Sequence, residues 1–480
     1  MIERIRRLEA VARALEPAAE ERRRLRDAVI AYGEEFLERL PEMNAYAGNG
    51  ERAKGLRRSP IGEEPADVRE LLRVVGECVD GTGIRPASGG HLGYIPSGGL
   101  YAAALGDYLA DVTNQFAGIR FAGPGAVEME DLCLEWMADL VGYPRGAGGN
   151  LTSGGSISNL IAIVTARDVH GLKAADIPRA VVYLTTQAHH SLDKALRIAG
   201  LGECVRRYVA MDEGYRMRPD ALETRIAEDR ARGLRPWLVI TAAGTTDVGA
   251  IDPLEAIGRV AQKHGLWHHV DAAYGGFFLL VEACRPRLGG IAVSDSVVLD
   301  PHKTLFLPYG CGAVLVRDRA AMRRAHAYEA HYLQDARADA LEDASPAELS
   351  PELTKHFRGL RLWLALKLHG LAPFRAALEE KLLLTRYFHE EARKLGFEVG
   401  PAPELSVATF RWVPERGDSN EFNRALLREI HRDGRVFLSS TMLDGKFTLR
   451  VATVVFRTHL ETIDLTLRLL KETVERLARV

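Results

Sequence analysis

The chain has 480 residues, of which 47% are hydrophobic and 27% are charged, a composition typical of a globular protein with a core large enough for a multi-part enzyme. The 63 Lys and Arg residues nearly balance the 65 Asp and Glu residues, leaving a formal charge of -2. The strongly basic field that nucleic acid or an anionic membrane selects is therefore not expected. Because no apolar run approaches the length of a membrane span, we expect no membrane association and a cytoplasmic location.

The N-terminal region predicts a helical arm that is separate from the rest of the protein. From the N-terminus to about Leu40, apolar residues recur at helical spacing among Arg and Glu, which indicates amphipathic helices. A polar stretch from Ala47 to Pro65 interrupts this pattern before another helix around residues 68–79. We expect residues 1–85 to form an arm that could cover a partner subunit.

Residues 86–370 are expected to form a large α/β domain. Between roughly Gly148 and Asp318, short β-branched runs alternate with helical segments, a pattern typical of βαβ units. The runs are continuously apolar, which favours a mainly parallel sheet with helices on both faces. The expected strands are residues 180–184, 237–241, 266–270, 296–299 and 313–316.

Residues 371–480 are expected to form a smaller C-terminal α+β domain. Helix-like segments at 374–395 and 419–433 and a terminal helix from His459 alternate with strand-like segments at 406–410 and 447–451. The sequence contains no internal repeat and no low-complexity tract. The expected fold class is therefore α/β, with a large domain around a mainly parallel sheet, a small α+β domain and the helical arm.

Five cysteines are scattered along the sequence without any C-x-x-C spacing. Such scatter argues against a disulfide framework or a zinc cluster and indicates reduced thiols, most of them in the core. We expect no metal site. The five are Cys78, Cys133, Cys204, Cys284 and Cys311.

Several polar residues stand at the ends of predicted strands, where open α/β sheets place their ligands. Lys303 follows strand 296–299, and Asp271 ends the strand before it along the chain. Pyridoxal 5′-phosphate (PLP) requires an amine that holds its aldehyde as a Schiff base and a carboxylate that keeps its pyridine nitrogen protonated. Lys303 and Asp271 can supply these two groups, and small Ala272 and Ala273 leave room for a ring.

Other residues of the same region match the remaining needs of PLP. The stretch Thr152-Ser-Gly-Gly-Ser-Ile-Ser-Asn159 precedes a helical run, Leu160 to Arg167, and backbone amides at a helix N-terminus can bind a phosphate together with the Ser156 hydroxyl. His189 can stack on the ring, and Thr246 falls at a further strand end. Each feature alone has an ordinary structural explanation, such as a cap or a surface histidine. Their occurrence together in one domain favours a PLP site.

Two groups of motifs carry a resemblance to a known family. In the first half of the chain they are Tyr94-x-Pro96-Ser97, Pro124-x-x-x-Glu128-x-Glu130, Gly154-Gly-Ser-x-Ser-Asn159 and Ala188-His189. In the second half they are Gly244-Thr-Thr246-x-x-Gly-Ala-x-Asp-Pro253, His269-Val-Asp-Ala-Ala273, Asp300-x-His-Lys303 and Phe357-Arg-Gly-Leu-Arg-Leu-Trp363. From about Gly89 to the C-terminus, the chain resembles the PLP-dependent decarboxylases of the aromatic amino acid, glutamate, histidine and cysteine sulfinate decarboxylase group.

The resemblance implies a role for individual positions. Lys303 would be the Schiff-base lysine, Asp271 the partner of the pyridine nitrogen, and His189 the residue stacked on the ring. Tyr332, on the family's mobile catalytic loop, would return a proton to the substrate Cα. The other cofactor-binding positions would be Gly155, Ser156, Thr246, Ala273 and His302, and the substrate positions would be His91, Tyr94, Ser97 and Arg450.

The resemblance also implies a fold-type-I homodimer with shared active sites, and the decarboxylation of a small-molecule L-amino acid to its amine and carbon dioxide. Thr304 replaces the tryptophan that commonly follows the lysine, and His91 stands where members that act on aromatic amino acids tend to have an aromatic residue. These two departures leave the substrate side chain open. Two alternative functions also remain open: another fold-type-I lyase or transaminase, and a catalytically silent homologue that acts as a binding or scaffold protein.

Overall fold

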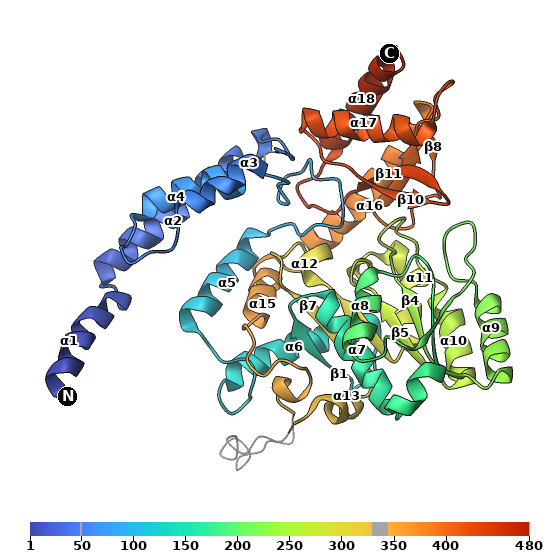
Figure 1. Ribbon diagram of the computed structural model, residues 1–480, viewed down its shortest axis with the longest axis horizontal. Helices are drawn as coiled ribbons and strands as arrows, with labels where there is room; N and C mark the ends of the chain where they lie inside the picture. The colour runs from blue at the N-terminus through green and yellow to red at the C-terminus, as the bar shows by residue number, and fades with distance from the viewer. Residues whose placement is uncertain (49, 329–343, 480) are drawn as a thin grey trace.

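The apolar runs predicted as strands form the middle of a seven-stranded sheet (Figure 1) in the computed structural model, which describes residues 1–48, 50–328 and 344–479. The strand order is β1-β7-β6-β5-β4-β2-β3. Strands β3, β2, β4, β5 and β6 are parallel, and β7 and β1 run antiparallel to their neighbours. The prediction of a mainly parallel sheet is therefore confirmed. The predicted strands correspond to β2 (Ala180–Leu184), β4 (Arg235–Ala242), β5 (Trp267–Asp271), β6 (Ser296–Leu299) and β7 (Gly312–Val316).

Two strands of this sheet were not predicted, and their composition explains why. Strand β1 (Gly148–Thr152) contains two glycines and an asparagine, which are depleted in strands. Strand β3 (Val205–Tyr208) contains two arginines and lies at the edge of the sheet, where it is only partly buried. Neither segment shows the continuous apolar character of the central strands.

Helices cover both faces of the sheet, so its central strands are buried on both sides. Alternate residues of β2 point to opposite faces: Val182 packs with helices α7 and α8, and Tyr183 packs with α9 and α10. The helices of the large domain are α5 (Tyr101–Thr113), α6 (Pro124–Val141), α7 (Gly155–Val169), α8 (His190–Ile198), α9 (Pro219–Ala231), α10 (Leu254–His264), α11 (Arg285–Leu288), α12 (Pro301–Thr304), α13 (Arg319–His326) and α15 (Gly359–His369).

The C-terminal part of the chain contains a second, antiparallel sheet of order β10-β11-β9-β8. Its strands are β8 (Glu398–Val399), β9 (Val407–Arg411), β10 (Ser439–Leu443) and β11 (Lys446–Ala452). Helices α16 (Ala372–Lys394), α17 (Ser419–Asp433) and α18 (Leu460–Leu477) share an apolar core with this sheet. Strands β9 and β11 match the sequence prediction, whereas the two-residue β8 and the more exposed β10 were not predicted.

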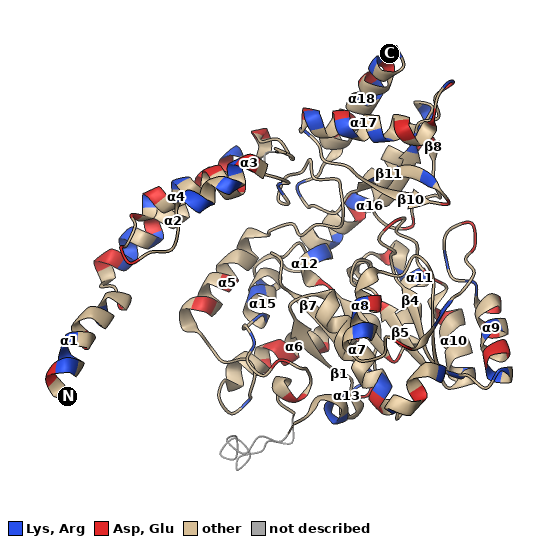
Figure 2. Ribbon diagram, viewed as in Figure 1, with Lys and Arg blue, Asp and Glu red and all other residues tan. Residues whose placement is uncertain are grey.

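The N-terminal helices extend away from the two sheets (Figure 1). They are α1 (Ile2–Ala12), α2 (Ala19–Arg39), α3 (Gly50–Ala53) and α4 (Val68–Val75). None of the residues of α1, α2 or α4 is buried, and charges of both signs are interspersed along them (Figure 2). In the described part of the chain, no helix is both long and apolar enough to cross a bilayer.

Candidate active site

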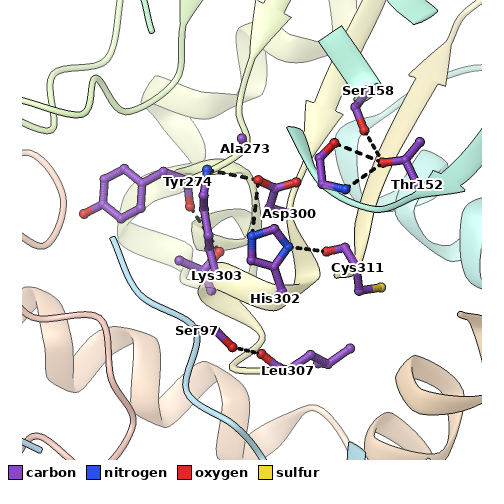
Figure 3. A network of polar contacts seen from close by, with 12 residues as sticks. Ser97, Thr152, Ser158, Ala273, Tyr274, Asp300, His302, Lys303, Leu307 and Cys311 are labelled. Carbon is purple, nitrogen blue, oxygen red and sulfur yellow. Dashed lines mark hydrogen bonds and ion pairs between the residues drawn. The ribbon is translucent and has the colours of Figure 1, made fainter. Parts of the chain in front are cut away.

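Lys303 is held at the carboxyl end of the central sheet by the short helix α12. Strand β6 ends at Leu299, and Pro301 then occupies the first turn of α12, where its missing N–H costs no hydrogen bond. Lys303 Nζ lies 3.0 Å from the Oδ2 atom of Asp300, three residues earlier (Figure 3). Burial opposes the lysine charge, but the carboxylates of Asp300 and Asp271 outweigh it, so the pKa of Lys303 lies above its usual value. The free side chain is therefore an ammonium at neutral pH.

Asp271 ends the neighbouring strand β5, so its carboxylate lies at the same edge of the sheet as Lys303. Its Oδ2 atom accepts a hydrogen bond from Asn159 Nδ2 at 3.2 Å, and its Oδ1 atom accepts one from the Ala273 backbone N–H at 3.1 Å. These two donors fix the carboxylate in one orientation. It is consequently available as the anionic partner of a cationic ligand atom.

His189 is the N-cap residue of helix α8. Its Nδ1 atom accepts a hydrogen bond from the Ser191 backbone N–H at 3.3 Å. Burial lowers the pKa of His189 below its usual value, so the ring is neutral at physiological pH, with its proton on Nε2. A neutral imidazole can stack on an aromatic ring without a charge to desolvate.

The glycines before helix α7 form an anion-binding cradle. The helix begins at Gly155, five residues earlier than the sequence predicted, because Gly154 adopts a φ of 145° that favours glycine. The first N–H groups of a helix have no intrahelical acceptor and can bind an anion. A Cβ atom on Gly155 would lie 3.0 Å from Asp300 Oδ2 and 3.4 Å from Ala273 Cβ, so a larger residue would crowd this cradle.

His302 stands beside this cradle on helix α12. Its Nδ1 atom donates to the Cys311 carbonyl oxygen at 2.7 Å, and its Nε2 atom lies 3.7 Å from Asp300 Oδ2 (Figure 3). Burial lowers the pKa of His302. The imidazole is therefore oriented by a backbone carbonyl, and its second nitrogen can donate to a phosphate only when the ring is protonated.

All of these groups line one cavity of about 500 Å³. The Lys303 amine, the Asp271 carboxylate and the N-terminus of α7 would therefore all face one bound molecule, and these are the groups that PLP requires. Its lining includes every residue that the sequence predicted to bind the cofactor: Gly155, Ser156, His189, Thr246, Asp271, Ala273, His302 and Lys303.

The lining also contains residues that were not predicted as site residues, among them Asn159, Ser191 and Asp300. The signal for two of them was present, since Asn159 ends the glycine-rich motif and Asp300 begins the motif that contains Lys303. Asp300 is buried, and its Oδ1 atom has no hydrogen-bond partner within the residues that the structure describes. A buried carboxylate with a free oxygen beside the cavity is suited to interact with a ligand.

The structure places the predicted substrate residues away from the lining of this cavity. Ser97 is buried and donates its hydroxyl hydrogen bond to the Leu307 carbonyl oxygen (Figure 3). Arg450 is also buried, and it donates to the backbone carbonyls of Thr246 and Asp247 and, at 2.8 Å, to the Ser439 hydroxyl. It thus joins the small domain to the loop that carries Thr246.

The remaining residues singled out in the sequence are His91, Tyr94, Thr304 and Tyr332. His91 is buried against Phe437, with ring centroids 5.6 Å apart, and burial lowers its pKa to about 4, whereas Tyr94 is exposed. Thr304 is buried and donates to the Tyr274 carbonyl oxygen at 3.1 Å. Tyr332 lies outside the described residues.

A model of the pyridoxal-dependent decarboxylase conserved domain matches residues 87–413. The chain belongs to this family. Among curated relatives, it is 33% identical over 406 residues to an aromatic-L-amino-acid decarboxylase of Bacillus atrophaeus, with 84% of each chain covered. It is 31% identical over 378 residues to an L-2,4-diaminobutyrate decarboxylase of Acinetobacter baumannii, with 74% of each covered.

Solved structures of other decarboxylases share the whole fold. A tryptophan decarboxylase from Oryza sativa, solved with PLP and tryptamine, superposes with a TM-score of 0.91 at 25% identity, covering 96% of this chain and 99% of that one. Mouse CSAD superposes with a TM-score of 0.86 at 27% identity, covering 95% and 99%. The resemblance found in the sequence, the fold class and PLP as the cofactor are thereby confirmed.

Proposed function

We propose that this pyridoxal-dependent decarboxylase removes the α-carboxylate of an L-amino acid as carbon dioxide and releases the amine. The observation that carries the proposal is the cavity in which Lys303, Asp271 and the N-terminus of helix α7 converge. When bound, PLP supplies a pyridinium ring that accepts the electron pair of the broken carbon–carbon bond. The protein must hold that ring, keep it charged and control the protons around it.

The proposed roles of the individual residues are those that the sequence resemblance implies, and their positions around one cavity support them. Lys303 would hold the cofactor covalently, and Asp271 would keep the ring nitrogen protonated because its anionic charge stabilises a pyridinium. The neutral His189 ring would stack on the cofactor. The α7 N-terminus, Ser156 and a protonated His302 would hold the phosphate. Thr246 and the small side chain of Ala273 would leave space for the ring.

The proton that completes the reaction is assigned to Tyr332, whose phenol would donate to the substrate Cα after carbon dioxide leaves. This assignment rests on the sequence, where Tyr332 lies in a polar stretch with few apolar residues. Ser97 and Arg450 support the substrate side indirectly. Arg450 holds the backbone of Thr246 in place, and Ser97 fixes the chain beside Leu307.

The proposed substrate is an L-amino acid, and the amino acids used by the relatives are the first candidates. The relatives named above act on aromatic amino acids or on 2,4-diaminobutyrate. The test is release of carbon dioxide from a panel containing tyrosine, tryptophan, phenylalanine, histidine, glutamate, 2,4-diaminobutyrate and cysteine sulfinate. We expect stoichiometric amine and carbon dioxide from at least one of them.

Two results would contradict the proposed function. Formation of a keto acid without carbon dioxide would identify a transaminase, and a purified protein that takes up no PLP would identify a catalytically silent homologue. Lys303→Ala is the negative control, because borohydride reduction should attach PLP to the wild-type protein through Lys303 alone. Peptide mapping that finds the label on another lysine would disprove this assignment.

A homodimer is the second part of the proposal, with the N-terminal helices of each chain packed on its partner. Helix α1 exposes Leu8 and Val11 at 60% and 75% of their surfaces, and such an extended apolar face is stabilised only when it is covered. We expect light scattering to give twice the chain mass. The double variant Leu8→Glu, Val11→Glu should shift this mass toward one chain, whereas Arg7→Gln on the same helix should not.

A cytoplasmic location completes the proposal. All five cysteines are buried and none is paired in a disulfide, which is the usual state of thiols in a reducing compartment. Fractionation of the native cell should therefore recover the protein with the soluble cytoplasmic enzymes. Recovery from an extracellular or membrane fraction would contradict this location.

A further inference from the structure

A continuous chain of buried polar groups lies behind the carboxylate of Asp271. Trp267 Nε1 lies 2.8 Å from Ser296 Oγ, which lies 2.8 Å from His269 Nδ1. The other ring nitrogen, Nε2, lies 2.8 Å from Asn159 Oδ1, and Asn159 Nδ2 lies 3.2 Å from Asp271 Oδ2. Ser296, His269 and Asn159 are buried almost completely, so their hydrogen bonds cannot be replaced by solvent.

The direction of each hydrogen bond in this chain follows from its Asp271 end. A carboxylate can only accept, so Asn159 Nδ2 donates to Asp271, and Asn159 Oδ1 must accept from His269 Nε2. His269 Nδ1 then accepts from the Ser296 hydroxyl, whose oxygen accepts the Trp267 N–H. Burial lowers the pKa of His269 to about 4, so the ring is neutral and carries its proton on Nε2. That N–H donates to Asn159 Oδ1, which turns the amide nitrogen of Asn159 toward Asp271.

A second branch leads from Asn159 to His189. Asn159 Nδ2 also lies 3.2 Å from Ser191 Oγ, which lies 2.7 Å from His189 Nδ1. Because Nδ1 already accepts from the Ser191 backbone N–H, the Ser191 hydroxyl donates to it as well. The two N–H groups of one amide therefore orient both the carboxylate below the expected ring nitrogen and the histidine expected to stack on the ring.

Strand geometry explains why these residues meet. Residues 267, 269 and 271 of β5 point to the same face of the sheet, because side chains alternate along a strand. Ser296 is the direct register partner of His269 on β6, and Asn159 lies on the second turn of α7, which covers this face. His268 points to the opposite face and bonds the Thr241 hydroxyl at 2.9 Å.

We propose that His269 and Asn159 are positioning residues that hold the Asp271 carboxylate against the pyridine nitrogen of PLP. This inference rests on the proposed function, because it assumes that Asp271 contacts that nitrogen. Without the His269 donor, the Asn159 amide can rotate and present its oxygen to the carboxylate, where two acceptors repel each other. Asp271 would then turn away, and the ring nitrogen would lose its anionic partner.

The first test measures the affinity of two cofactors for the apoprotein of each variant. The cofactors are PLP and its deaza analogue, in which a C–H group replaces the ring nitrogen and cannot use Asp271. His269→Leu should weaken PLP binding about tenfold, because a misoriented Asp271 carboxylate loses its charge-assisted hydrogen bond to the ring nitrogen. Binding of the deaza analogue, which cannot form that bond, should not change. His269→Gln should retain most of the PLP affinity, because its terminal amide replaces the Nε2–H donor.

The second test uses two variants, each of which removes one buried hydroxyl that is hydrogen-bonded to a histidine side chain of strand β5. Ser296→Ala removes the acceptor and donor that fix the His269 tautomer, and it should lower PLP affinity without affecting the deaza analogue. Thr241→Val is the matched control, since its hydroxyl contacts His268 on the opposite face. It should leave both affinities unchanged.

The outcomes separate this inference from the proposed function. Equal losses for PLP and the deaza analogue in His269→Leu and Ser296→Ala would show a purely structural role and overturn the inference. Unchanged PLP affinity in both variants would also overturn it. Failure of the wild-type protein to bind PLP, or equal wild-type affinity for the two cofactors, would instead contradict the cofactor assignment from which the inference starts.

Discussion

The carboxylate of Asp300 lies 3.0 Å from the ammonium nitrogen of Lys303, within the same turn that leads from β6 into α12. This pairing keeps the free lysine protonated, because Asp300 and Asp271 together outweigh the effect of burial on its pKa. An ammonium cannot attack an aldehyde, so the lysine must lose its proton before it can bind PLP. The pH at which the apoprotein takes up PLP therefore reports the strength of this pair.

Asp300→Asn should move the pH dependence of PLP uptake to lower pH. The substitution removes a negative charge beside Lys303, which lowers the pKa of the lysine and leaves more free amine at a given pH. The measurement is the rate of absorbance change after mixing apoprotein with PLP over a pH series. Asp295→Asn is the control, because Asp295 is a largely buried carboxylate bonded to the His268 N–H outside the cavity. An unchanged inflection in Asp300→Asn would contradict the prediction.

Asp271→Asn should retain PLP but lose catalytic activity. The amide can still donate to or accept from the ring, but it has no charge with which to hold the nitrogen as a pyridinium. We expect kcat to fall at least about a hundredfold, in line with the loss of a charge that stabilises a transition state. The measurement combines kcat with the PLP content per chain. Near-normal kcat in a fully loaded variant would give Asp271 a different role.

The sequence predicted the central sheet well because burial on both faces forces continuous apolar strands. It also predicted that Asp271 and Lys303 lie close together, since each follows such a strand and parallel strands end at one edge. The strands β1 and β3 were not predicted because their glycines and arginines interrupt the apolar pattern that indicates a strand. Their positions depend on pairing with distant strands, which composition does not encode.

The substrate side of the site was harder to predict, for a physical reason. The direction of the Arg450 side chain depends on the packing of the small sheet against a loop about two hundred residues earlier. His269 and Asn159 were likewise recognised only as parts of motifs, because a buried histidine and a residue near a helix start look structural in sequence. Their hydrogen-bonded chain becomes visible only when β5, β6 and α7 are assembled.

Tyr332→Phe should separate loss of carbon dioxide from formation of amine. The substitution keeps the ring but removes the acidic hydroxyl, so carbon dioxide can still leave while the substrate carbon waits for a proton. We expect amine formation to fall about a hundredfold or more, which is the range typical of general-acid catalysis. Amine and carbon dioxide are measured in parallel, in air and under nitrogen, to detect oxidation to an aldehyde. Unchanged amine formation would exclude Tyr332 as the essential acid.

Lys355 and Glu130 form an ion pair in the core, with a distance of 2.6 Å between Lys355 Nζ and Glu130 Oε2 and almost no exposed side-chain surface. Glu130 on α6 also accepts the backbone N–H groups of Arg358 and Gly359, at 3.0 and 3.2 Å. Lys355 donates in addition to Asn150 of β1 at 2.5 Å. The pair thus joins the chain before α15 to both α6 and β1.

Lys355→Met should therefore destabilise the protein strongly, although the new side chain fits the same apolar space. It leaves the Glu130 carboxylate buried without its cation, which costs about 3–5 kcal/mol. Adding Glu130→Gln should recover part of that loss, because the neutral amide oxygen can still accept the Arg358 and Gly359 N–H groups without an unpaired charge. Urea unfolding of the two variants and the wild type, with equal PLP loading, gives the comparison. If Lys355→Met alone costs less than about 1 kcal/mol, the range of an exposed ion pair, the pair does not hold these elements together.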